Sequence, residues 1–441
     1  MTTIQQPARA LPVIGHYDTI VCGGGPAGFA AAIAASRNGA STLLIERYGF
    51  LGGTGTAGLM VDFGTFHDGT RPLVGGVLLE LLTRMEDRLG AHRRNNEITQ
   101  GVTYDVEAMI AVCQAMALEA GVTLRLHTMV TDVIMEGDRV TGVALESKSG
   151  REAVTGRVFI DATGDGDLAA FAGADYVKGR EGDGKMQPVS HELIVGGVDM
   201  GRVPKNHREL VPAIEEARAA GAWPIPTERF FSWGPVPKCD RHGDPSRGYY
   251  FLNVTNALDV DGTRADDLTR AEIECRNQVD PLVDFLRKNA PGFENCWLDR
   301  TATQIGVRET RRIVGEHVLM RDDVLAARHF ADGVVPAMNS IDVHDLEGKH
   351  FDHEFLKEGT HYQVPWRCLI PKRLEGLIVA GRCLSADHKA LGSARVMVIC
   401  TPMGEAAGRG AALAVREKCG VREVAVDEVR EGMRAAGTVI E

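Results

Sequence analysis

The sequence predicts an α/β protein: a parallel sheet with helices on both faces and an added β-hairpin or meander, interrupted by an inserted α+β domain with an antiparallel sheet. Three observations predict it. Residues 17–47 contain, in order, an apolar strand, a cluster of glycines, an alanine-rich helix, a second apolar strand and an acid. Short apolar runs at 158–161 and 377–380 are typical of further buried parallel strands. Between them, the alternating segments 190–198 and 248–256 indicate an antiparallel sheet.

The first strand, 17–22, leads into the most informative motif, Gly23-x-Gly25-x-x-Gly28. In a strand–turn–helix unit, the first glycine permits the sharp turn and the second lets the backbone approach a pyrophosphate. The third lets the helix pack close to the strand. The helix N-terminus then faces the phosphates. Glu46 ends the second strand, about 20 residues later, where a carboxylate accepts hydrogen bonds from ribose hydroxyls. The order predicts a dinucleotide site, but does not separate FAD from NAD.

The segments that follow predict the rest of this domain. Residues 104–121 have apolar side chains at about i, i+3 and i+4, which predicts an amphipathic helix. Residues 124–128, 131–137 and 138–147 are predicted strands, the last two forming a hairpin across the Gly-Asp pair at 137–138.

Two later segments bear on which dinucleotide is bound. The strand at 158–161 runs into Ala-Thr-Gly, and Gly164 and Gly166 allow a close approach to a cofactor. The strand at 377–380 is followed by a glycine-serine turn and an alanine-rich helix from about Thr401. Such a helix can direct its N-terminus at the pyrimidine edge of a flavin and stabilise negative charge there. These segments favour a flavin.

Five blocks of sequence carry a resemblance to a known family: residues 10–35, 43–58, 159–169, 304–316 and 364–397. Together they resemble the FAD-dependent oxidoreductases of the glutathione-reductase-like superfamily. The blocks lie in order over nearly the whole chain. The resemblance implies a Rossmann-like FAD-binding domain and FAD as cofactor, without specifying the reaction.

The resemblance also implies which residues bind FAD. At the pyrophosphate it implies Gly23, Gly25, Pro26, Ala27 and Gly28, and at the adenosine ribose Glu46 and Arg47. Close to the flavin it implies Gly52, Gly53 and Thr54, and on the adenine side Thr163 and Gly164. Along the ribityl chain and ring it implies Gly381, Arg382, Ser393, Arg395 and Val396.

The predicted FAD-binding domain is discontinuous. We expect it to comprise residues 12–180 and 366–441, with 1–11 as an N-terminal extension. Residues 181–365 are expected to form a substrate or cap domain that covers the flavin and supplies the substrate pocket.

Candidate acid–base residues come from the histidines, because the ordinary pKa of histidine lies near neutrality. A flavin accepts hydride at N5, so the protein must place a C–H bond there and remove a proton from the neighbouring heteroatom. By position, His191, His361 and His388 are candidates. The alternatives are a hydrogen-bonded wall residue for His191 and His361, and a hydrogen bond that fixes a loop for His388.

Arg308 is the fourth catalytic candidate, with Arg311 beside it in the same segment. A guanidinium forms a rigid fork for a carboxylate, so it could bind a substrate acid group or stabilise reduced flavin. The alternative is an internal ion pair with Glu309 or Glu316.

The net charge and the cysteine content limit the classes of partner and cofactor that we expect. The net charge of −11 argues against a nucleic-acid groove or an anionic membrane surface, although local arginines could still bind an anionic substrate. Nine cysteines without a CxxC pair indicate a reducing, cytoplasmic protein and argue against a metal or redox-disulfide site. No apolar run approaches the length of a membrane span, and no signal peptide is visible. A homo-oligomer remains open.

The first functional hypothesis is an FAD-dependent dehydrogenase or oxidase that removes hydride from a small polar molecule, with oxygen or another acceptor reoxidising the flavin. No separate NAD(P)H domain is visible, which favours it. The second is an NAD(P)H-driven monooxygenase or ene-type reductase. The third is a flavin-binding protein without turnover, since fold alone does not decide function.

Overall fold

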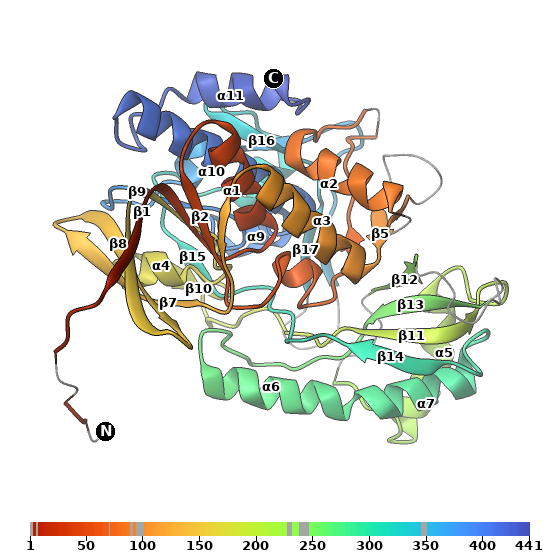
Figure 1. The fold of residues 1–441 in the computed structure, drawn as a ribbon. Helices are drawn as coiled ribbons and strands as arrows, with labels where there is room; N and C mark the ends of the chain where they lie inside the picture. The colour runs from red at the N-terminus through yellow and green to blue at the C-terminus, as the bar shows by residue number, and fades with distance from the viewer. Residues whose placement is uncertain are drawn as a thin grey trace.

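The computed structural model describes residues 3–5, 8–69, 71–88, 91–93, 101–226, 232–237, 247–344 and 351–441. A mostly parallel sheet forms the upper part of the molecule in Figure 1. Its parallel strands are β6 (Thr123–Arg125), β2 (Thr42–Ile45), β1 (Val13–Cys22), β9 (Gly150–Asp161) and β20 (Leu377–Val379). Antiparallel β8 (Arg139–Ser147) and β7 (Met129–Glu136) extend it beyond β9.

Apolar side chains cover both faces of this sheet, as expected of parallel strands. On one face Val21, Leu44 and Ile160 pack in the largest core cluster of the described residues. On the other face Ile20 and Phe159 belong to a second cluster that includes residues of β7 and β8. Alternate residues of the same strand thus point to opposite cores.

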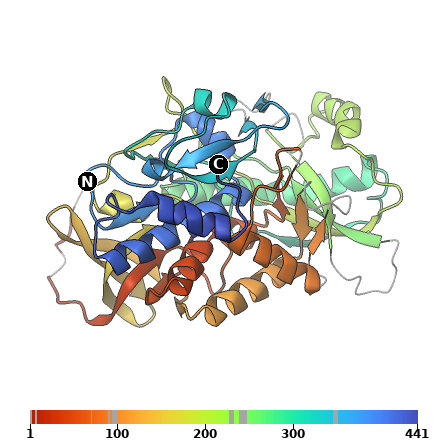
Figure 2. The same ribbon diagram turned by 90° about the horizontal axis from the view of Figure 1, so that it is seen from above.

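The helices on the first face are α1 (Pro26–Arg37), α2 (Gly76–Asp87), α3 (Val106–Glu119), α10 (Met397–Glu417) and α11 (Val426–Ala435). The first and last parts of the chain meet where α1 packs along α10 (Figure 2). Glycine makes this close packing possible, because a Cβ at Gly404 or Gly408 would collide with the carbonyl oxygens of Ala27 and Ala31 in α1. On the second face lies the short helix α4 (Asp167–Phe171).

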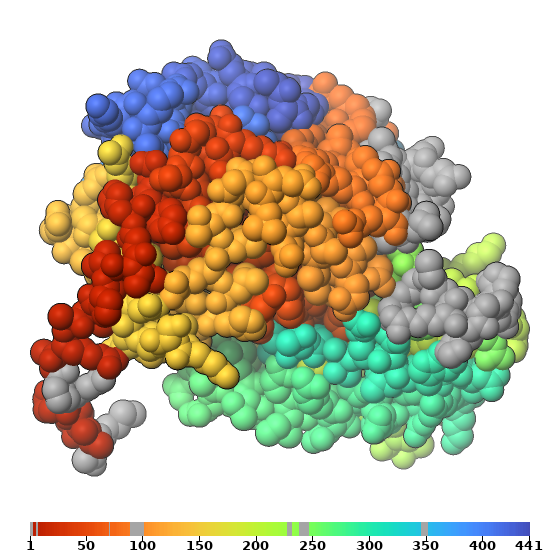
Figure 3. All heavy atoms as spheres, viewed as in Figure 1, coloured from red at the N-terminus to blue at the C-terminus, as the bar shows by residue number. Residues whose placement is uncertain are grey.

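An antiparallel sheet lies in the lower right part of the molecule as drawn in Figure 1. The green segments around it fill the lower part of the space-filling view in Figure 3. Its strands lie in the order β12 (Ser232–Val236), β13 (Arg247–Asn253), β11 (Leu193–Asp199) and β14 (Trp297–Thr301). The accompanying helices are η3 (His207–Leu210), α5 (Val211–Ala219), α6 (Ala265–Asn277) and α7 (Val279–Asn289). Apolar residues of η3, α5 and α7 form a core of their own with β11 and β13. The buried residues of α6, Ala271 and Cys275, belong to a separate small cluster.

Small sheets join the two parts. They are β3 (Asp62–Phe63) with β5 (Val102–Tyr104) and β4 (Ala91–Arg93), β10 (Tyr176–Lys178) with β15 (Arg311–Ile313), β16 (Gly333–Ala337) with β19 (Tyr362–Pro365), and β17 (Ile341–His344) with β18 (Phe351–Glu354). The remaining short helices are η1 (Gly53–Gly55), α8 (Arg321–Leu325), η4 (Trp366–Cys368) and α9 (His388–Ala394).

The predicted fold class is confirmed, including the hairpin of β7 and β8 across residues 137–138. The C-terminal helix begins at Met397, earlier than the predicted Thr401. The predicted glycine-serine turn is wrong, because those residues belong to α9. The Asp387 side chain accepts a hydrogen bond from the Ala390 N–H (2.6 Å) and caps that helix. Among the described residues, no helix has the length and apolar character needed to cross a membrane.

Candidate functional site

A cavity of about 1490 Å³ lies between the parallel sheet and the antiparallel sheet. Four residues that line it follow directly, or within two positions, the carboxyl ends of parallel strands: Gly23, Glu46, Thr163 and Gly381. This is where ligands bind in open α/β sheets. The opposite walls come from the inserted segment, including α6, residues 304–308 and the β17–β18 hairpin.

The glycine turn has the geometry that the sequence predicts. Gly23 has φ +97°, and a Cβ there would collide with the Ala162 carbonyl group. A Cβ on Gly28 would collide with the carbonyl oxygen of Gly23, which keeps α1 close to β1. Gly25 is different, because the nearest atom to its Cβ is 3.8 Å away, at Gly53. Gly25 therefore leaves open space on the cavity side, where its backbone can approach a ligand.

Polar groups continue from this turn along the cavity. Pro26 occupies the first turn of α1, and no side chain caps the helix, so its amide groups remain available to an anion. The Glu46 carboxylate accepts hydrogen bonds from the N–H groups of Gly24 (2.7 Å) and Tyr48 (2.9 Å). Arg47 donates to Oε1 of Gln304 at 2.6 Å. The inserted segment therefore reaches the end of the cavity beside Glu46.

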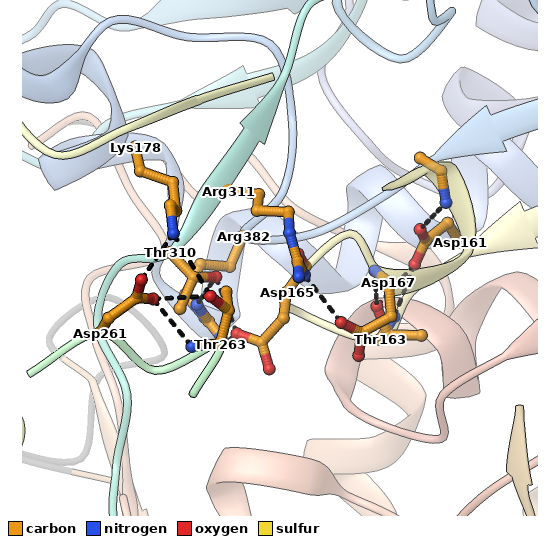
Figure 4. Close-up of polar contacts among 11 residues, drawn as sticks. Asp161, Thr163, Asp165, Asp167, Lys178, Asp261, Thr263, Thr310, Arg311 and Arg382 are labelled. Carbon is orange, nitrogen blue, oxygen red and sulfur yellow. Dashed lines mark hydrogen bonds and ion pairs between the residues drawn. The ribbon is translucent and has the colours of Figure 1, made fainter. Parts of the chain in front are cut away.

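A network of polar contacts holds the loop after β9 (Figure 4). The buried Asp161 carboxylate accepts hydrogen bonds from Thr163 N–H (3.1 Å) and Ala169 N–H (2.8 Å). Arg382 donates to Asp165 (2.7 Å). Arg311 donates to Asp167 (2.8 Å). Burial foremost raises the pKa of Asp161 to about 6. The loop containing Thr163 and Gly164 is thus fixed from both the parallel sheet and the inserted segment.

The N-terminus of α10 forms another part of the wall. Val396 and Met397 line the cavity, and no side chain caps this helix. Arg395 also lines the cavity and donates to the backbone oxygen of Asp342 (3.0 Å). Ser393 does not line the cavity. Its hydroxyl group donates a hydrogen bond to Asn339 O (2.6 Å).

The residues present fit a dinucleotide. Along one cavity the chain supplies two helix N-termini, a glycine turn with open space and a carboxylate at the end of β2. Of the predicted cofactor-binding residues, those that line the cavity are Gly23, Gly25, Pro26, Ala27, Glu46, Arg47, Gly53, Thr54, Thr163, Gly164, Gly381, Arg382, Arg395 and Val396. Gly28, Gly52 and Ser393 lie behind this wall. The Gly52 N–H donates to Gly24 O (2.9 Å), so Gly52 supports the glycine turn.

Arg308 stands in the wall of the cavity and is almost entirely buried. Its Nη1 donates to Pro188 O and to Ser190 Oγ, both at 2.8 Å. Its Nη2 donates to Asn253 Oδ1 at 2.9 Å. Burial foremost lowers its pKa to about 10. The two glutamates that the alternative names as ion-pair partners lie beside other arginines: Glu309 forms an ion pair with Arg312, and Glu316 forms one with Arg422.

His191 does not line the cavity, whereas its neighbours Ser190 and Glu192 do. Adjacent residues in an extended chain point to opposite faces, so a shift of one residue exchanges the two sides. The His191 ring is fully buried, with Nδ1 3.3 Å from Oε2 of Glu272. Burial foremost lowers its pKa to about 4. The cavity therefore favours Glu192 over His191 as a group that meets a ligand.

Glu192 is a site residue that the sequence analysis missed. It is 4% exposed, and its Oε2 has no hydrogen-bond partner among the described residues. Burial raises its pKa well above the ordinary value, and Asp62 adds to this effect while Arg308 opposes it. The strand pattern of residues 190–198 could have found it, since Ser190 and Glu192 share a face.

The other two candidate histidines lie outside the cavity lining. His388 begins α9, and its Nδ1 is 3.0 Å from Oε1 of Glu309, which holds the loop. The ring nitrogens of His361 and His329 and a carboxylate oxygen of Glu441 lie within 4.8 Å of one another, close enough to hold a metal ion. Among the described residues, this is the only group of three histidine, cysteine, aspartate or glutamate side chains with that spacing.

The β17–β18 hairpin adds three residues that the sequence analysis did not select: Asp342, His344 and His353, all lining the cavity. Asp342 and His353 are direct partners across the hairpin. Asp342 and His344 are two apart on one strand, so they share a face. That Asp-x-His spacing was a usable signal, but only once the segment was known to be a strand.

Two curated proteins match parts of this chain. The chain is 48% identical to dihydrolipoyl dehydrogenase of Trypanosoma brucei brucei over 46 residues, a tenth of either protein. It is 28% identical to thiamine thiazole synthase of Methanococcus vannielii over 157 residues, 34% of this chain and 56% of the synthase. The chain thus spans only part of the length of these relatives.

Solved structures of similar fold cover nearly the whole chain. One is p-nitrophenol 4-monooxygenase from Pseudomonas putida, with a TM-score of 0.49 and 12% identity, over 95% of this chain and 84% of that one. Another is a geranylgeranyl bacteriochlorophyll reductase-like protein from Thermoplasma acidophilum, with a TM-score of 0.46 and 13% identity, over 97% and 92%.

The model of one protein family, described as FAD-dependent oxidoreductase, matches residues 18–433, which include both helix N-termini and the whole inserted segment. This chain therefore belongs to the FAD-dependent oxidoreductase family, with FAD as its cofactor.

Proposed function

We propose that the enzyme is a dehydrogenase or oxidase, which removes hydride from a small polar substrate to N5 of the flavin. FAD would extend along the parallel-strand side of the cavity, with its pyrophosphate at Gly23, Gly25 and the start of α1. Glu46 and Arg47 would bind the adenosine ribose. The flavin would then lie toward Gly53, Thr54 and the start of α10, whose positive end can stabilise a reduced ring.

The Glu192 carboxyl group carries this proposal. It is buried, it faces the cavity, and its Oε2 has no hydrogen-bond partner among the described residues. A buried polar atom without a partner costs about 1–3 kcal/mol, so its retention suggests that a ligand supplies the missing bond. Because burial raises its pKa well above the ordinary value, the protonated form of Glu192 is favoured, and its O–H could donate a hydrogen bond to a substrate oxygen.

Arg308 complements Glu192 in this proposal. Hydrogen bonds to Pro188, Ser190 and Asn253 hold its guanidinium in place, so little side-chain entropy would be lost when an anionic or carbonyl group binds nearby. A protonated carboxyl and a guanidinium in one wall suit a substrate that carries oxygen atoms. The alcohol or amine group that is to be oxidised would lie between this wall and the flavin.

The same proposal includes a division of the chain into two domains. We propose residues 12–180 and 366–441 as the FAD-binding domain and 181–365 as the substrate domain, in a glutathione-reductase-like arrangement. Ser190 and Glu192 just before β11, α6 and the β17–β18 hairpin, which all belong to 181–365, contribute to the walls opposite the glycine turn. Oxygen or another small acceptor would reoxidise the flavin.

Anaerobic visible spectra of the purified holoenzyme test the proposal. Glycolate, lactate, glycerate, benzyl alcohol and benzylamine would be added separately, and NADH and NADPH in parallel. We expect at least one of the first five compounds to bleach the flavin, and the nicotinamides to leave it oxidised. Rapid bleaching by NADH or NADPH, with none by the other compounds, would contradict the proposal and favour an NAD(P)H-driven monooxygenase or reductase.

A further inference from the structure

The β17–β18 hairpin brings one carboxylate between two imidazoles. Asp342 and His353 are paired directly across the hairpin, and His344 lies two residues beyond Asp342 on the same face. Oδ1 of Asp342 is 3.2 Å from Nε2 of His353, and Oδ2 is 3.5 Å from Nε2 of His344. The backbone pairing fixes this arrangement, and all three residues line the cavity.

The two imidazoles have opposite environments. His344 is buried, and burial foremost, followed by the charge of Arg308, lowers its pKa to about 3. The His353 side chain is 40% exposed, and its hydrogen bond to Asp342 raises its pKa. Burial alone would raise the pKa of Asp342, but contacts with His344, His353 and Arg395 lower it well below the ordinary value. A shared carboxylate thus serves one neutral imidazole and one basic imidazole.

Charged groups from neighbouring elements surround this cluster. Arg208 of η3 opposes protonation of His353, and Arg308 and Arg395 act on His344. On the other side of the hairpin, Asp352 pairs with Lys389 of α9, and Glu354 pairs with Arg321 of α8. The hydrogen bond and the charge of Asp342 both raise the pKa of His353, so this carboxylate sets the basicity of that ring.

The cluster of Asp342, His344 and His353 also adjoins the part of the cavity wall that contains Glu192 and Arg308. Arg308 influences the pKa of Glu192 on one side and of His344 on the other. Glu192 is buried, whereas His353 is partly exposed, so the polar groups extend from the interior of the cavity toward solvent. Removal of a proton from a buried substrate requires such a route, because the proton must finally reach water.

We propose that His353, oriented by Asp342, accepts the proton that the substrate loses on oxidation and passes it to solvent. The inference rests on the proposed dehydrogenase or oxidase function and adds its missing base. In the substrate, the C–H bond breaks and its electron pair leaves as hydride to FAD, the oxidant. The O–H or N–H bond breaks, its electron pair forms the C=O or C=N bond, and the proton binds His353. Asp342 stabilises the resulting imidazolium.

The first test needs no substrate. Histidine ring carbons would be followed by NMR in the holoenzyme over a range of pH, and His353→Gln would assign the signal. We expect His353 to titrate above the ordinary value for histidine, and its pKa to fall by about one unit or more in Asp342→Asn. Asp352→Asn is the matched control, since Asp352 lies on the same hairpin but not in the cavity lining, and it should leave the titration unchanged. A pKa that is the same in Asp342→Asn and in the wild-type protein would overturn the inference.

The second test is the pH dependence of anaerobic flavin reduction by whichever of the five compounds bleaches the wild-type enzyme. The rate should rise with pH as His353 loses its proton. In His353→Gln this rise should disappear, and the rate should fall about 10²–10⁴-fold while the flavin stays bound. An unchanged profile in His353→Gln would refute the role of His353 alone. No bleaching of the wild-type enzyme by any compound would instead refute the proposed function, and the inference with it.

Discussion

The two ends of the cavity are built in different ways. At the glycine turn, the groups that would meet the cofactor are largely backbone: the turn at Gly23, the open position at Gly25 and the free amides of α1. At the other end, the groups are buried side chains from separate elements, such as Glu192, Arg308 and His344. Backbone recognition imposes a spacing that can be read in a sequence. Side-chain recognition depends on which face each residue occupies after folding.

The largest effect should come from changing the backbone-built end. Gly23→Ala places a Cβ at φ +97° against the Ala162 carbonyl group, so the turn must move away from the cavity. We expect the variant to be purified with little or no flavin, and its Kd for FAD to rise at least about 100-fold. Visible absorbance per protein and FAD titration would measure both.

Gly39→Ala is the matched control for this change. Gly39 has a nearly equal φ of +90°, but nothing lies within 4 Å of its Cβ. Gly39→Ala should therefore introduce only the backbone strain of a left-handed alanine, which costs about 1–2 kcal/mol of stability, and the variant should keep its flavin. Equal loss of flavin in both variants would mean that strain, not the geometry of the cavity wall, explains the result.

The next largest effect should come from the side-chain-built end, where two adjacent residues can be compared. Glu192→Gln keeps the size of the side chain but replaces the acidic O–H that would donate to the substrate oxygen with a weaker amide donor, and we expect flavin reduction to slow by about 10²-fold with flavin still bound. His191→Gln, one residue away and outside the cavity lining, should change the rate by less than about threefold. Anaerobic stopped-flow reduction would measure both.

The reverse order of effects would show that the chain turns the other face of this segment to the substrate. Thermal unfolding of both variants serves as the control, because His191 and Glu192 are both buried and either change could loosen the protein. A slow but stable Glu192→Gln enzyme separates chemistry from folding.

Most of the fold could be predicted from the sequence, because burial on both faces and the glycine spacing leave direct patterns. The strands ending at Cys22 and Asp161 and the helix after Gly25 were predicted close to their observed places. The start of α10 was misplaced because residues 397–400 form an uninterrupted apolar run just before Pro402, and such a run has no helical periodicity. The helix capped by Asp387 was missed because its polar and small residues give no apolar periodicity, although aspartate three positions before an amide is a usual capping signal.

The side-chain-built end could be predicted only in part. Arg308 was selected from its type and position, and it does line the cavity. Glu192 was missed because, in a sequence, a glutamate near the end of an apolar strand is expected to be exposed to solvent. His191 beside it was selected because histidine is a common acid–base residue. Asp342 and His353 are brought together by the register of β17 and β18, two strands that the sequence analysis did not predict. No local pattern encodes that pairing.

A smaller, pH-dependent effect should appear at Asp161, which supports the cofactor-binding end from behind. Its pKa rises from an ordinary 3.8 to about 6 on burial, so the folded state binds the proton more tightly than the unfolded state. This contribution to stability is complete below pH 3.8 and is lost as the pH rises through about 6. The gap corresponds to about 3 kcal/mol at most.

Asp161→Asn removes this ionisation and isolates it from the many other carboxyl groups. Denaturant unfolding of both proteins should be measured from pH 4 to pH 7. Relative to the wild-type protein, the free energy of unfolding of the variant should rise across this range. A constant difference would show that Asp161 ionises with its ordinary pKa and that its hydrogen bonds to Thr163 and Ala169 offset burial.

The smallest effect should come from His361, which was a catalytic candidate by sequence position. Its ring lies beside His329 and Glu441 and outside the cavity lining, and burial foremost lowers its pKa. His361→Gln should therefore keep the rate of flavin reduction within about twofold and change stability by about 1 kcal/mol or less. His353→Gln, measured in the same stopped-flow series, provides the contrasting histidine. A tenfold slower reduction in His361→Gln with normal flavin content would mean that a residue outside the cavity wall controls the chemistry, and the division between the two ends would then be incomplete.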